Sequence, residues 1–357
     1  MKKCFFVLLM FSALNSQAQG IRFEEESVDL ESLYQQIDEA ISQSPIYVSV
    51  REKHIADCRD SLLNENDPEK RIVKAERLFR LYRPYRNDSA LHYAELCISL
   101  SESIRRPDLT GRFRSMLAFQ CSNTDMEAEA LEQLHLVNRS ALDQKGLVDY
   151  YHAWMHVCGK MASYTQRETK HRAYLDRQDL YRDSVMMVAS EGSEEWLHLK
   201  MDILCALRQF QEALHVSNKW LKTVSDGTHE SAYAAFYRSV VYDHLNNHDL
   251  SRYWLGKSAL DDIQCAVMDQ ASLLFLAEHL ASDGDVDRAE RYMEFARECN
   301  TSFSPNLRAY QFGSIINVVK KSRDAAQNCS NTILIAAGVV IILLLLALII
   351  VIVRKRK

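Results

Sequence analysis

The chain has 357 residues, a net charge of −5, and only 10 glycines and 5 prolines, so these two helix breakers make up about 4% of it against a usual 12% or so. This low content argues against β-sandwiches, β-barrels and glycine-looped nucleotide-binding folds. With 47% hydrophobic and 25% charged residues the chain is too apolar to be disordered, which leaves a large all-α fold.

The first 18 residues have the features of a secretory signal peptide. Lys2 and Lys3 precede a short apolar run, and Ser16-Gln17-Ala18 supplies the small residues of a cleavage site. We therefore expect cleavage after Ala18 and leave residues 1–18 out of the fold. The alternative is a buried N-terminal helix.

Residues 19–321 are expected to form a helical repeat domain. Apolar positions recur there at helical spacing, in segments separated by short polar breaks. The clearest unit, residues 272–296, resembles the tetratricopeptide repeat (TPR), in which small residues let two antiparallel helices approach closely. Its expected packing residues are Leu273, Leu276, Ala277, Gly284, Ala289, Met293 and Ala296.

Counting back from Ala289 locates the same position in earlier units, at intervals of 36 to 43 residues. These positions are Tyr253, Ala213, Ala173, Ala130 and Ala90. Such units cannot bury their apolar faces alone, so they are predicted to stack into a curved solenoid with a concave face. Residues 28–65 are predicted to form two helices before the first unit, and a last helix is predicted from Pro305 to Lys321.

Two histidine pairs have the spacing of metal ligands. His152 and His156 lie four residues apart on one helix face, but no third ligand and no H-E-x-x-H motif accompany them. His244 and His248 fall at a repeat turn, where capping or solvent contact is expected. No phosphate-binding glycine loop, G-x-S-x-G elbow or kinase motif is present. We expect no metal, no cofactor and no enzymatic activity.

The eight cysteines beyond the signal peptide are 24 to 60 residues apart and form no C-x-x-C motif. They are Cys58, Cys97, Cys121, Cys158, Cys205, Cys265, Cys299 and Cys329. Buried thiols are expected, with one or two disulfides as the alternative in an oxidising compartment.

Four arginines recur at every third position on the helix predicted after Pro68. They are Arg77, Arg80, Arg83 and Arg86. One interpretation is a site for an anionic partner, since the arginine fork matches carboxylate and phosphate. The other, which we favour here, is a solvated face paired with acidic residues of neighbouring helices.

Aromatic residues recur along the array and permit two interpretations. They are Tyr150, Tyr151, Trp154, Trp196, Trp220, Tyr233, Phe236 and Tyr237. Packing between repeat helices is the expected role. Aromatic pockets for a peptide or glycan in the concave groove are the alternative.

The C-terminus is expected to anchor the chain in a membrane. Residues 333–353 carry no charge or hydrogen-bonding side chain, and at about 1.5 Å per residue they span roughly the 30 Å of a bilayer core. Residues 322–332 are expected to be a juxtamembrane linker. The basic tail that follows the span consists of Arg354, Lys355, Arg356 and Lys357.

The charges predict the orientation. The positive-inside rule places residues 354–357 in the cytoplasm, and so the repeats outside, on the periplasmic side of the inner membrane. Without the six basic residues of the two ends, 37 basic residues face 48 acidic ones, a net charge of −11. An acidic exported domain is not expected to bind nucleic acid, whereas the basic tail can attract lipid headgroups. A glycosylphosphatidylinositol signal is a weaker alternative, because it normally lacks a basic end.

Residues 258–277, 284–289 and 85–94 resemble the Bacteroidota-type membrane-anchored TPR regulators. In that family a signal peptide, periplasmic repeats and one transmembrane helix precede a cytoplasmic domain of unknown function with a helix-turn-helix-like end. This sequence stops four residues after the predicted span. We therefore expect either a truncated or split regulator, or a receptor that signals through a cytoplasmic partner.

The expected function is that of a membrane-anchored sensor or scaffold whose repeat groove binds a protein, peptide or glycan. Binding would alter the curvature of the solenoid, and the last helix would transmit the change to the membrane span. The alternative is a structural subunit of a cell-envelope complex, in which the span is only a tether.

Overall fold

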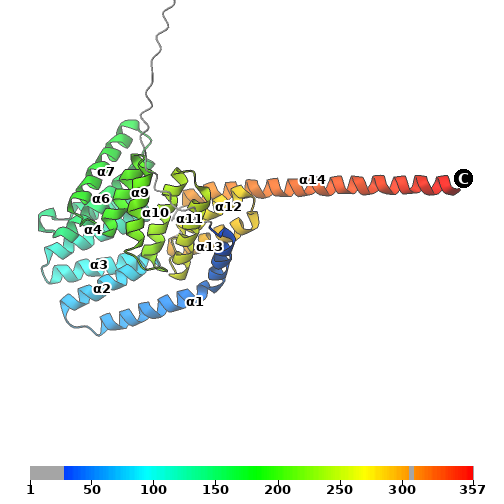
Figure 1. Ribbon diagram of the computed structural model, residues 1–357. Helices are drawn as coiled ribbons and strands as arrows, with labels where there is room; N and C mark the ends of the chain where they lie inside the picture. The colour runs from blue at the N-terminus through cyan, green and yellow to red at the C-terminus, as the bar shows by residue number, and fades with distance from the viewer. Residues whose placement is uncertain (1–27, 305–308, 357) are drawn as a thin grey trace, which may run out of the picture.

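The computed structural model describes residues 28–304 and 309–356, and all regular elements in these ranges are helices (Figure 1). The all-α, TPR-like class predicted from composition and spacing is confirmed. The predicted signal peptide with Ala18 and the predicted helix start at Pro305 lie outside the described residues.

Six helix pairs follow one another along the described chain, with a 3-10 turn, η1 (Arg139–Ala141), between the second pair and the third. The pairs are α2 (Pro68–Tyr82) with α3 (Asn87–Ser103), α4 (Pro107–Asn123) with α5 (Glu127–His135), α6 (Gln144–Tyr164) with α7 (Glu168–Val188), α8 (Glu194–Ala206) with α9 (Phe210–Leu221), α10 (His229–His244) with α11 (His248–Gln264), and α12 (Ala271–Asp283) with α13 (Val286–Phe303). The helices α1 (Leu30–Leu63) and α14 (Ala309–Arg356) flank them.

Local chemistry sets the ends of these helices. Asp67 accepts hydrogen bonds from the backbone amides of Glu69 and Lys70, and Pro68 occupies the first turn, where no amide hydrogen is needed. In the clearest repeat, Gly284 ends α12 with a left-handed φ of 94°, and Asp285 caps α13. A short polar turn thus separates two antiparallel helices, as expected.

The repeat positions are buried in most second helices. Ala90, Ala130, Ala213 and Ala289 are 0% exposed, and Tyr253 is half-buried. Ala173 in α7 is exposed, contrary to the prediction. The reason is that α7 packs mainly on α6, while the next helix meets it only near its end, where Val185 joins Met155 and Leu199 in a small apolar cluster. We call α2–α7 the first half of the array and α8–α13 the second half.

Residues 30–63 form one helix, α1, where two were predicted. Pro45 lies inside it, and the helix bends (Figure 1). Before the bend, Leu33 and Ile37 pack in the cluster of α11–α14; after it, Ile55 and Leu62 pack in the cluster of the first half. Proline is tolerated here because a bent helix reaches two separate cores.

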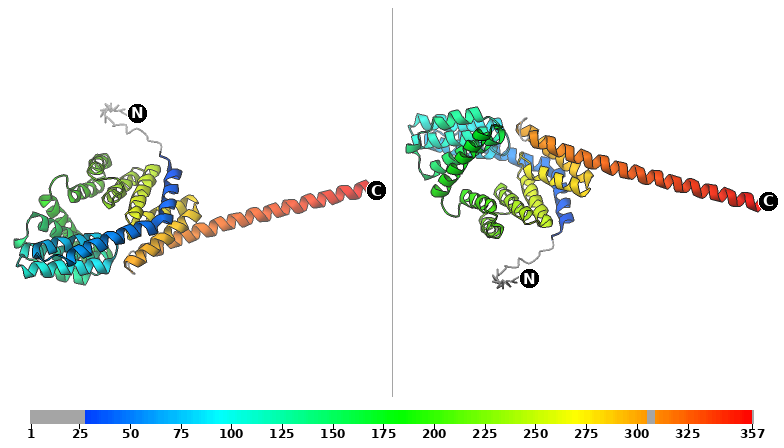
Figure 2. Two further views of the ribbon diagram at one scale, coloured as in Figure 1. Left: turned by 90° about the horizontal axis from the view of Figure 1, so that it is seen from below. Right: turned by 90° about the horizontal axis from the view of Figure 1, so that it is seen from above.

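The helix α1 and two turns close the array on itself. The Arg51 guanidinium of α1 donates hydrogen bonds to the carbonyls of Cys265, after α11, and Leu81, near the end of α2. The array therefore curves round until its fifth helix pair meets its first, and Figure 2 shows this curvature from two sides. Side chains of the first helices of both halves face one another within this curve.

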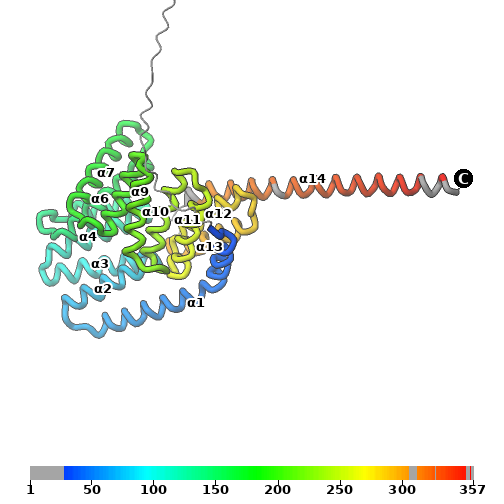
Figure 3. Tube along the Cα trace, in the orientation of Figure 1, coloured from blue at the N-terminus to red at the C-terminus, as the bar shows by residue number. Residues whose placement is uncertain are grey.

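The last helix, α14, starts on the array and leaves it (Figure 3). Phe312, Ile315 and Val319 are buried in the core of α11–α13, and Arg323 pairs with Asp287 and Glu290 of α13. Beyond this point the helix is exposed, first polar over residues 324–332 and then apolar, with a mean hydropathy of 3.5 over its most apolar window. It is long and apolar enough to cross a membrane.

Residues 322–332, predicted as a linker, are part of α14. The segment has no glycine or proline, and Thr332 Oγ1 donates to the carbonyl of Asn328, so nothing in it interrupts the helix. The docked segment and the predicted span are thus one element. Of the basic tail, Arg354 is exposed, and the side chains of Lys355, Arg356 and Lys357 lie outside the described set.

Candidate functional site

The strongest candidate for a binding site is the inner surface of the array, where the first helices of the two halves face each other. We use "inner surface" for the following side chains. They are Arg83, Phe119, His152 and His156 from the first half and Glu194, His198, His229, Tyr233 and Tyr237 from the second.

In the first half, a phenylalanine ring lies between a cation and two imidazoles. The Arg83 guanidinium is 4.9 Å from the centroid of the Phe119 ring. The rings of His152 and His156 lie 5.0 and 4.6 Å from Phe119, and His156 Nδ1 is 3.1 Å from Ser122 Oγ. Side chains from the end of α2, from α4 and from α6 therefore form one continuous patch.

In the second half, histidine and tyrosine rings pack above a buried tryptophan. His198 lies 4.3 Å from Tyr237 and 5.3 Å from Tyr233, centroid to centroid, and Trp220 beneath them is 0% exposed. Next to them, His229 Nδ1 is 2.8 Å from Asp262 Oδ1. In this aromatic patch Tyr233 and Tyr237 are half-buried and His229 is exposed, whereas His198 is buried.

The titration of these groups shows that the two halves act on each other. Burial lowers the pKa of His152 to about 3, with smaller contributions from His198, His156 and Arg83. Burial also lowers the pKa of His156 to about 4, and it raises the pKa of Tyr233 to about 12. At neutral pH His152 and His156 are thus neutral imidazoles and Tyr233 is a neutral phenol, and all three can form hydrogen bonds with a polar ligand. The Asp262 carboxylate raises the pKa of His229 against the effect of its burial.

A buried ion network holds the first half in shape behind this surface. Arg112 of α4, 5% exposed, donates from Nη2 to Glu76 Oε1 of α2 at 2.7 Å and from Nε to Asp149 Oδ2 of α6 at 2.9 Å. Burial would raise the pKa of Glu76, but Arg112 and Arg80 outweigh it and lower the value to about 2. The network fixes the spacing of three first helices.

Comparison with known proteins identifies the family. The SusR N-terminal TPR domain matches residues 41–314, most of the chain. The chain belongs to the SusR-type TPR family. This confirms the resemblance to Bacteroidota membrane-anchored TPR regulators. TPR domains of this kind are typically non-catalytic and typically bind protein partners.

Other comparisons add little to the SusR-type assignment. No curated protein matches the chain. Among solved structures, the TPR2AB-domain:pHSP90 complex of yeast Sti1 is similar at 10% identity, over 80% of this chain and 99% of that chain, with a TM-score of 0.32. At this TM-score the superposition carries no argument about shape or binding.

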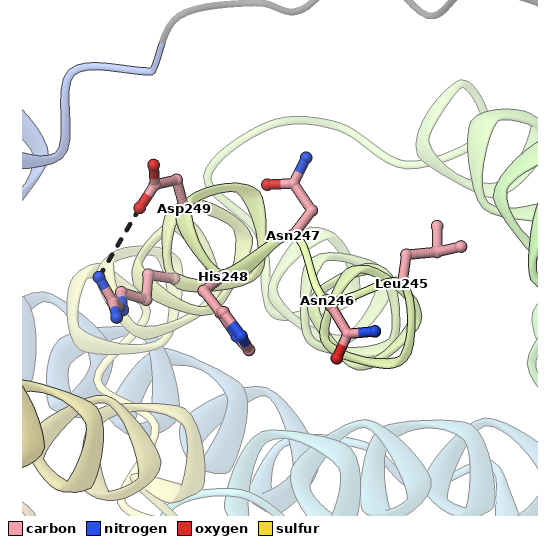
Figure 4. Close-up of a pocket in the computed structure, with 6 residues that line it drawn as sticks. Leu245, Asn246, Asn247, His248 and Asp249 are labelled. Atoms are coloured by element: carbon pink, nitrogen blue, oxygen red, sulfur yellow. Dashed lines mark ion pairs between the residues drawn. The ribbon is translucent and has the colours of Figure 1, made fainter.

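Surface hollows of the SusR-type domain lie away from the inner surface. One, of about 560 Å³, is open and shallow at the α10–α11 turn, lined by residues 245–249 and Arg252 (Figure 4). His248, predicted to have a capping or solvent role, lies there 3.8 Å from Asp243. Another hollow, of about 50 Å³, is walled by apolar residues of α1, α11 and α13. Neither gathers charged and aromatic groups as the inner surface does.

The residues singled out in the sequence have different places. The four arginines do not form one stripe, because α2 ends at Tyr82. Arg80 and Arg86 pair with Glu76 and Glu52. Arg77 contacts His54, and only Arg83 belongs to the inner surface.

Of the predicted aromatics, Tyr233 and Tyr237 reach the inner surface, whereas Trp154 stacks on Tyr181 and Trp220 is core. Among the predicted packing residues, Leu273, Leu276, Ala277, Ala289 and Ala296 are fully buried and Met293 is half-buried; the fully buried Tyr292 was not predicted. Within the described ranges, no group of three or more metal-ligating residues occurs, and the eight cysteines there are free.

Phe119 and His198 were not predicted as site residues, although a signal for them was present. Arg83, Phe119, His156, His198 and Tyr237 follow one another at intervals of 36, 37, 42 and 39 residues, close to the repeat period. They therefore hold equivalent positions at the inner ends or faces of successive first helices.

Proposed function

We propose that this chain is the sensor part of a SusR-type transmembrane regulator, anchored in the inner membrane with its repeats in the periplasm. The observation that carries the proposal is α14, which begins in the core of the array and continues into the apolar stretch without a break. A rigid helix shared by a binding domain and a membrane span is a direct mechanical connection.

The inner surface is the proposed place for the ligand, a protein, peptide or glycan. Aromatic rings offer flat apolar faces, and neutral imidazoles and phenols offer hydrogen bonds, a combination suited to ligands with both characters. The ligand would contact both halves, since Phe119 and His152 come from the first and Tyr233 and Tyr237 from the second.

Binding would change the relation of the two halves and so move α14. Between the halves, the apolar contacts are small: the cluster around Val185 at one junction and Met268 against the first-half core at the other. Gly192 in the α7–α8 turn has a left-handed φ of 84°. The second half carries α14 on α12 and α13. A rotation of the second half would therefore tilt or shift the span.

The orientation follows from charge. The basic residues 354–357 are proposed to lie in the cytoplasm, next to lipid headgroups and a cytoplasmic regulatory partner. No direct contact of this chain with nucleic acid is proposed, because the exported part is acidic.

Hydrogen exchange on the full chain in detergent tests the proposal. We would screen peptides and oligosaccharides for binding and compare amide exchange with and without the bound probe. Altered exchange in residues 312–332 is expected in addition to changes at the inner surface. Unchanged exchange in α14 on binding would contradict transmission.

Replacing residues 333–353 with an unrelated single-pass helix distinguishes the sensor from the alternative, a structural subunit of an envelope complex. A tether keeps its function after this exchange, whereas a signalling helix loses it. A second control keeps the span and replaces only its lipid-facing leucines and isoleucines by one another.

A further inference from the structure

Arg83 differs from the other charged groups that surround the inner surface. Arg112 is bound by Glu76 and Asp149, and His229 by Asp262. Arg83 is exposed, contacts the face of Phe119, and has no ion pair within the part of the chain that the structure describes. Its planar fork is therefore free to accept a ligand group.

The position of Arg83 is central. Its charge acts on Tyr233 of α10, Glu194 of α8 and Asp149 of α6, and it lowers the pKa of His152. Groups of both halves thus lie within electrostatic reach of this solvent-exposed guanidinium, and desolvation by the surrounding protein lowers the pKa of Arg83. A charge held partly out of bulk water interacts more strongly with an opposite charge than one on an open surface.

The acidic neighbours do not cancel this charge. Asp149 is engaged by Arg112 at 2.9 Å. Glu194 forms no ion pair with Arg83 among the described residues, and burial, together with Glu195 and Glu230, raises its pKa. The two nearest histidines are neutral at pH 7, since their pKa values lie at about 3 and 4. Arg83 thus remains the strong hydrogen-bond donor with a full charge in the first-half patch.

We propose that Arg83 is an anion subsite of the inner surface, which receives a carboxylate or phosphate oxyanion of the ligand. The proposal rests on the proposed sensor function and narrows its ligand to an acidic molecule. Phe119 beneath the guanidinium sets its plane, so that the two outer nitrogens can bind two oxygens at once. The neutral His152 and His156 rings lie beside the same phenylalanine and can donate further hydrogen bonds.

The test is a set of calorimetric titrations of the full chain in detergent at constant ionic strength. The probes are sodium glucuronate, neutral glucose as its matched uncharged counterpart, and inorganic phosphate. We expect glucuronate to bind at least about tenfold more tightly than glucose, because a charge-assisted hydrogen bond adds about 1.5–3 kcal/mol. The phosphate arm shows whether the subsite accepts a free phosphate or requires a carboxylate on an organic ligand.

Three variants assign the effect to the residue. Arg83→Gln should weaken glucuronate about 10- to 100-fold, and Arg83→Lys should weaken it less, because it keeps the charge but not the fork. Arg77→Gln, a change in α2 six residues before Arg83 and in contact with His54, should leave glucuronate binding unchanged. Equal binding of glucuronate by the wild type and Arg83→Gln would overturn the subsite, as would failure of both anions to bind more tightly than glucose.

These outcomes stay distinct from failure of the sensor function. A neutral peptide or oligosaccharide that binds, alters exchange in α14 and is unaffected by Arg83→Gln would remove the anion subsite and leave the sensor proposal standing. Anion binding at Arg83 without any change of exchange in α14 would keep the anion subsite and contradict the sensor proposal.

Discussion

The backbone amide of Met268 donates a hydrogen bond of 2.8 Å to the carbonyl of Pro84, joining the turn after α11 to the turn between α2 and α3. In an open solenoid each repeat contacts only its neighbours, and these two turns would lie far apart. Here the first and fifth helix pairs meet, and Arg51 of α1 binds a carbonyl near each. This closure defines the inner surface.

Arg51→Met should weaken the closure. The variant keeps the apolar stem but leaves the carbonyls of Cys265 and Leu81 without their charged donor, so we expect a loss of about 2–4 kcal/mol in unfolding free energy. Urea unfolding followed by circular dichroism measures this. Arg59→Met, at an exposed position of the same helix, should change stability by less than about 0.5 kcal/mol. Equal effects of the two variants would show that Arg51 does not hold the ends together.

Arg112→Met should be more severe. It leaves Glu76 and Asp149 buried without their shared cation, and breaking a buried ion network in this way costs about 3–5 kcal/mol. The control is Arg114→Met on the same helix, whose ion pair with the exposed Glu102 is worth less than about 1 kcal/mol. A smaller loss for Arg112→Met than for the control would contradict the network.

His152 predicts a loss of stability in acid. Its pKa is about 3 when folded and near 6.5 when unfolded, so between these values the unfolded chain binds a proton that the folded chain does not. Stability should therefore fall as the pH drops from about 6.5 towards 3. His152→Gln should lose less stability than the wild type between pH 7 and pH 5, while His54→Gln, at an exposed site, should follow the wild type. Parallel curves for all three proteins would show that His152 is not buried in solution.

Substituting glycine by alanine tests the contact between α1 and α11. A Cβ at Gly256 would lie 2.8 Å from Leu33 Cδ2, whereas nothing lies within 4 Å of one at Gly313 in α14. Alanine gains helix propensity at both sites, about 1 kcal/mol, but at Gly256 it also displaces Leu33. We expect Gly256→Ala to be about 1–3 kcal/mol less stable than Gly313→Ala in thermal unfolding. Equal stability would mean that α1 packs less closely there.

The continuity of α14 predicts the effect of a helix breaker. Asn328→Pro removes a helix hydrogen bond and crowds the preceding turn, so amides around residues 324–332 should exchange faster. Residues 312–319 should stay protected, because Phe312, Ile315 and Val319 remain buried in the array. Asn328→Ala is the control. The same exchange in both variants would show that residues 322–332 are already unfolded in solution.

The sequence by itself determined the all-α class, most of the helix pairs and the apolar stretch near the C-terminus. Few glycines and prolines, regular apolar spacing and small residues such as Ala90, Ala213 and Ala289 are local features, and local geometry turns them directly into packed helix pairs. The long apolar run before Arg354 is equally local. The resemblance to the family also rests on such local sequence features, so it could be stated from the sequence.

Only the tertiary structure decided which side chains share the inner surface and how the array closes. Arg77 and Arg83 follow the same spacing in the sequence. Because α2 ends at Tyr82, however, Arg83 lies on the inner surface, whereas Arg77 contacts His54. Ala173 is exposed because α7 packs mainly on α6, which its own segment does not reveal. The bond from Met268 to Pro84 depends on the small rotation added at every repeat. Such rotations accumulate over six helix pairs, so no single segment encodes where the two ends meet.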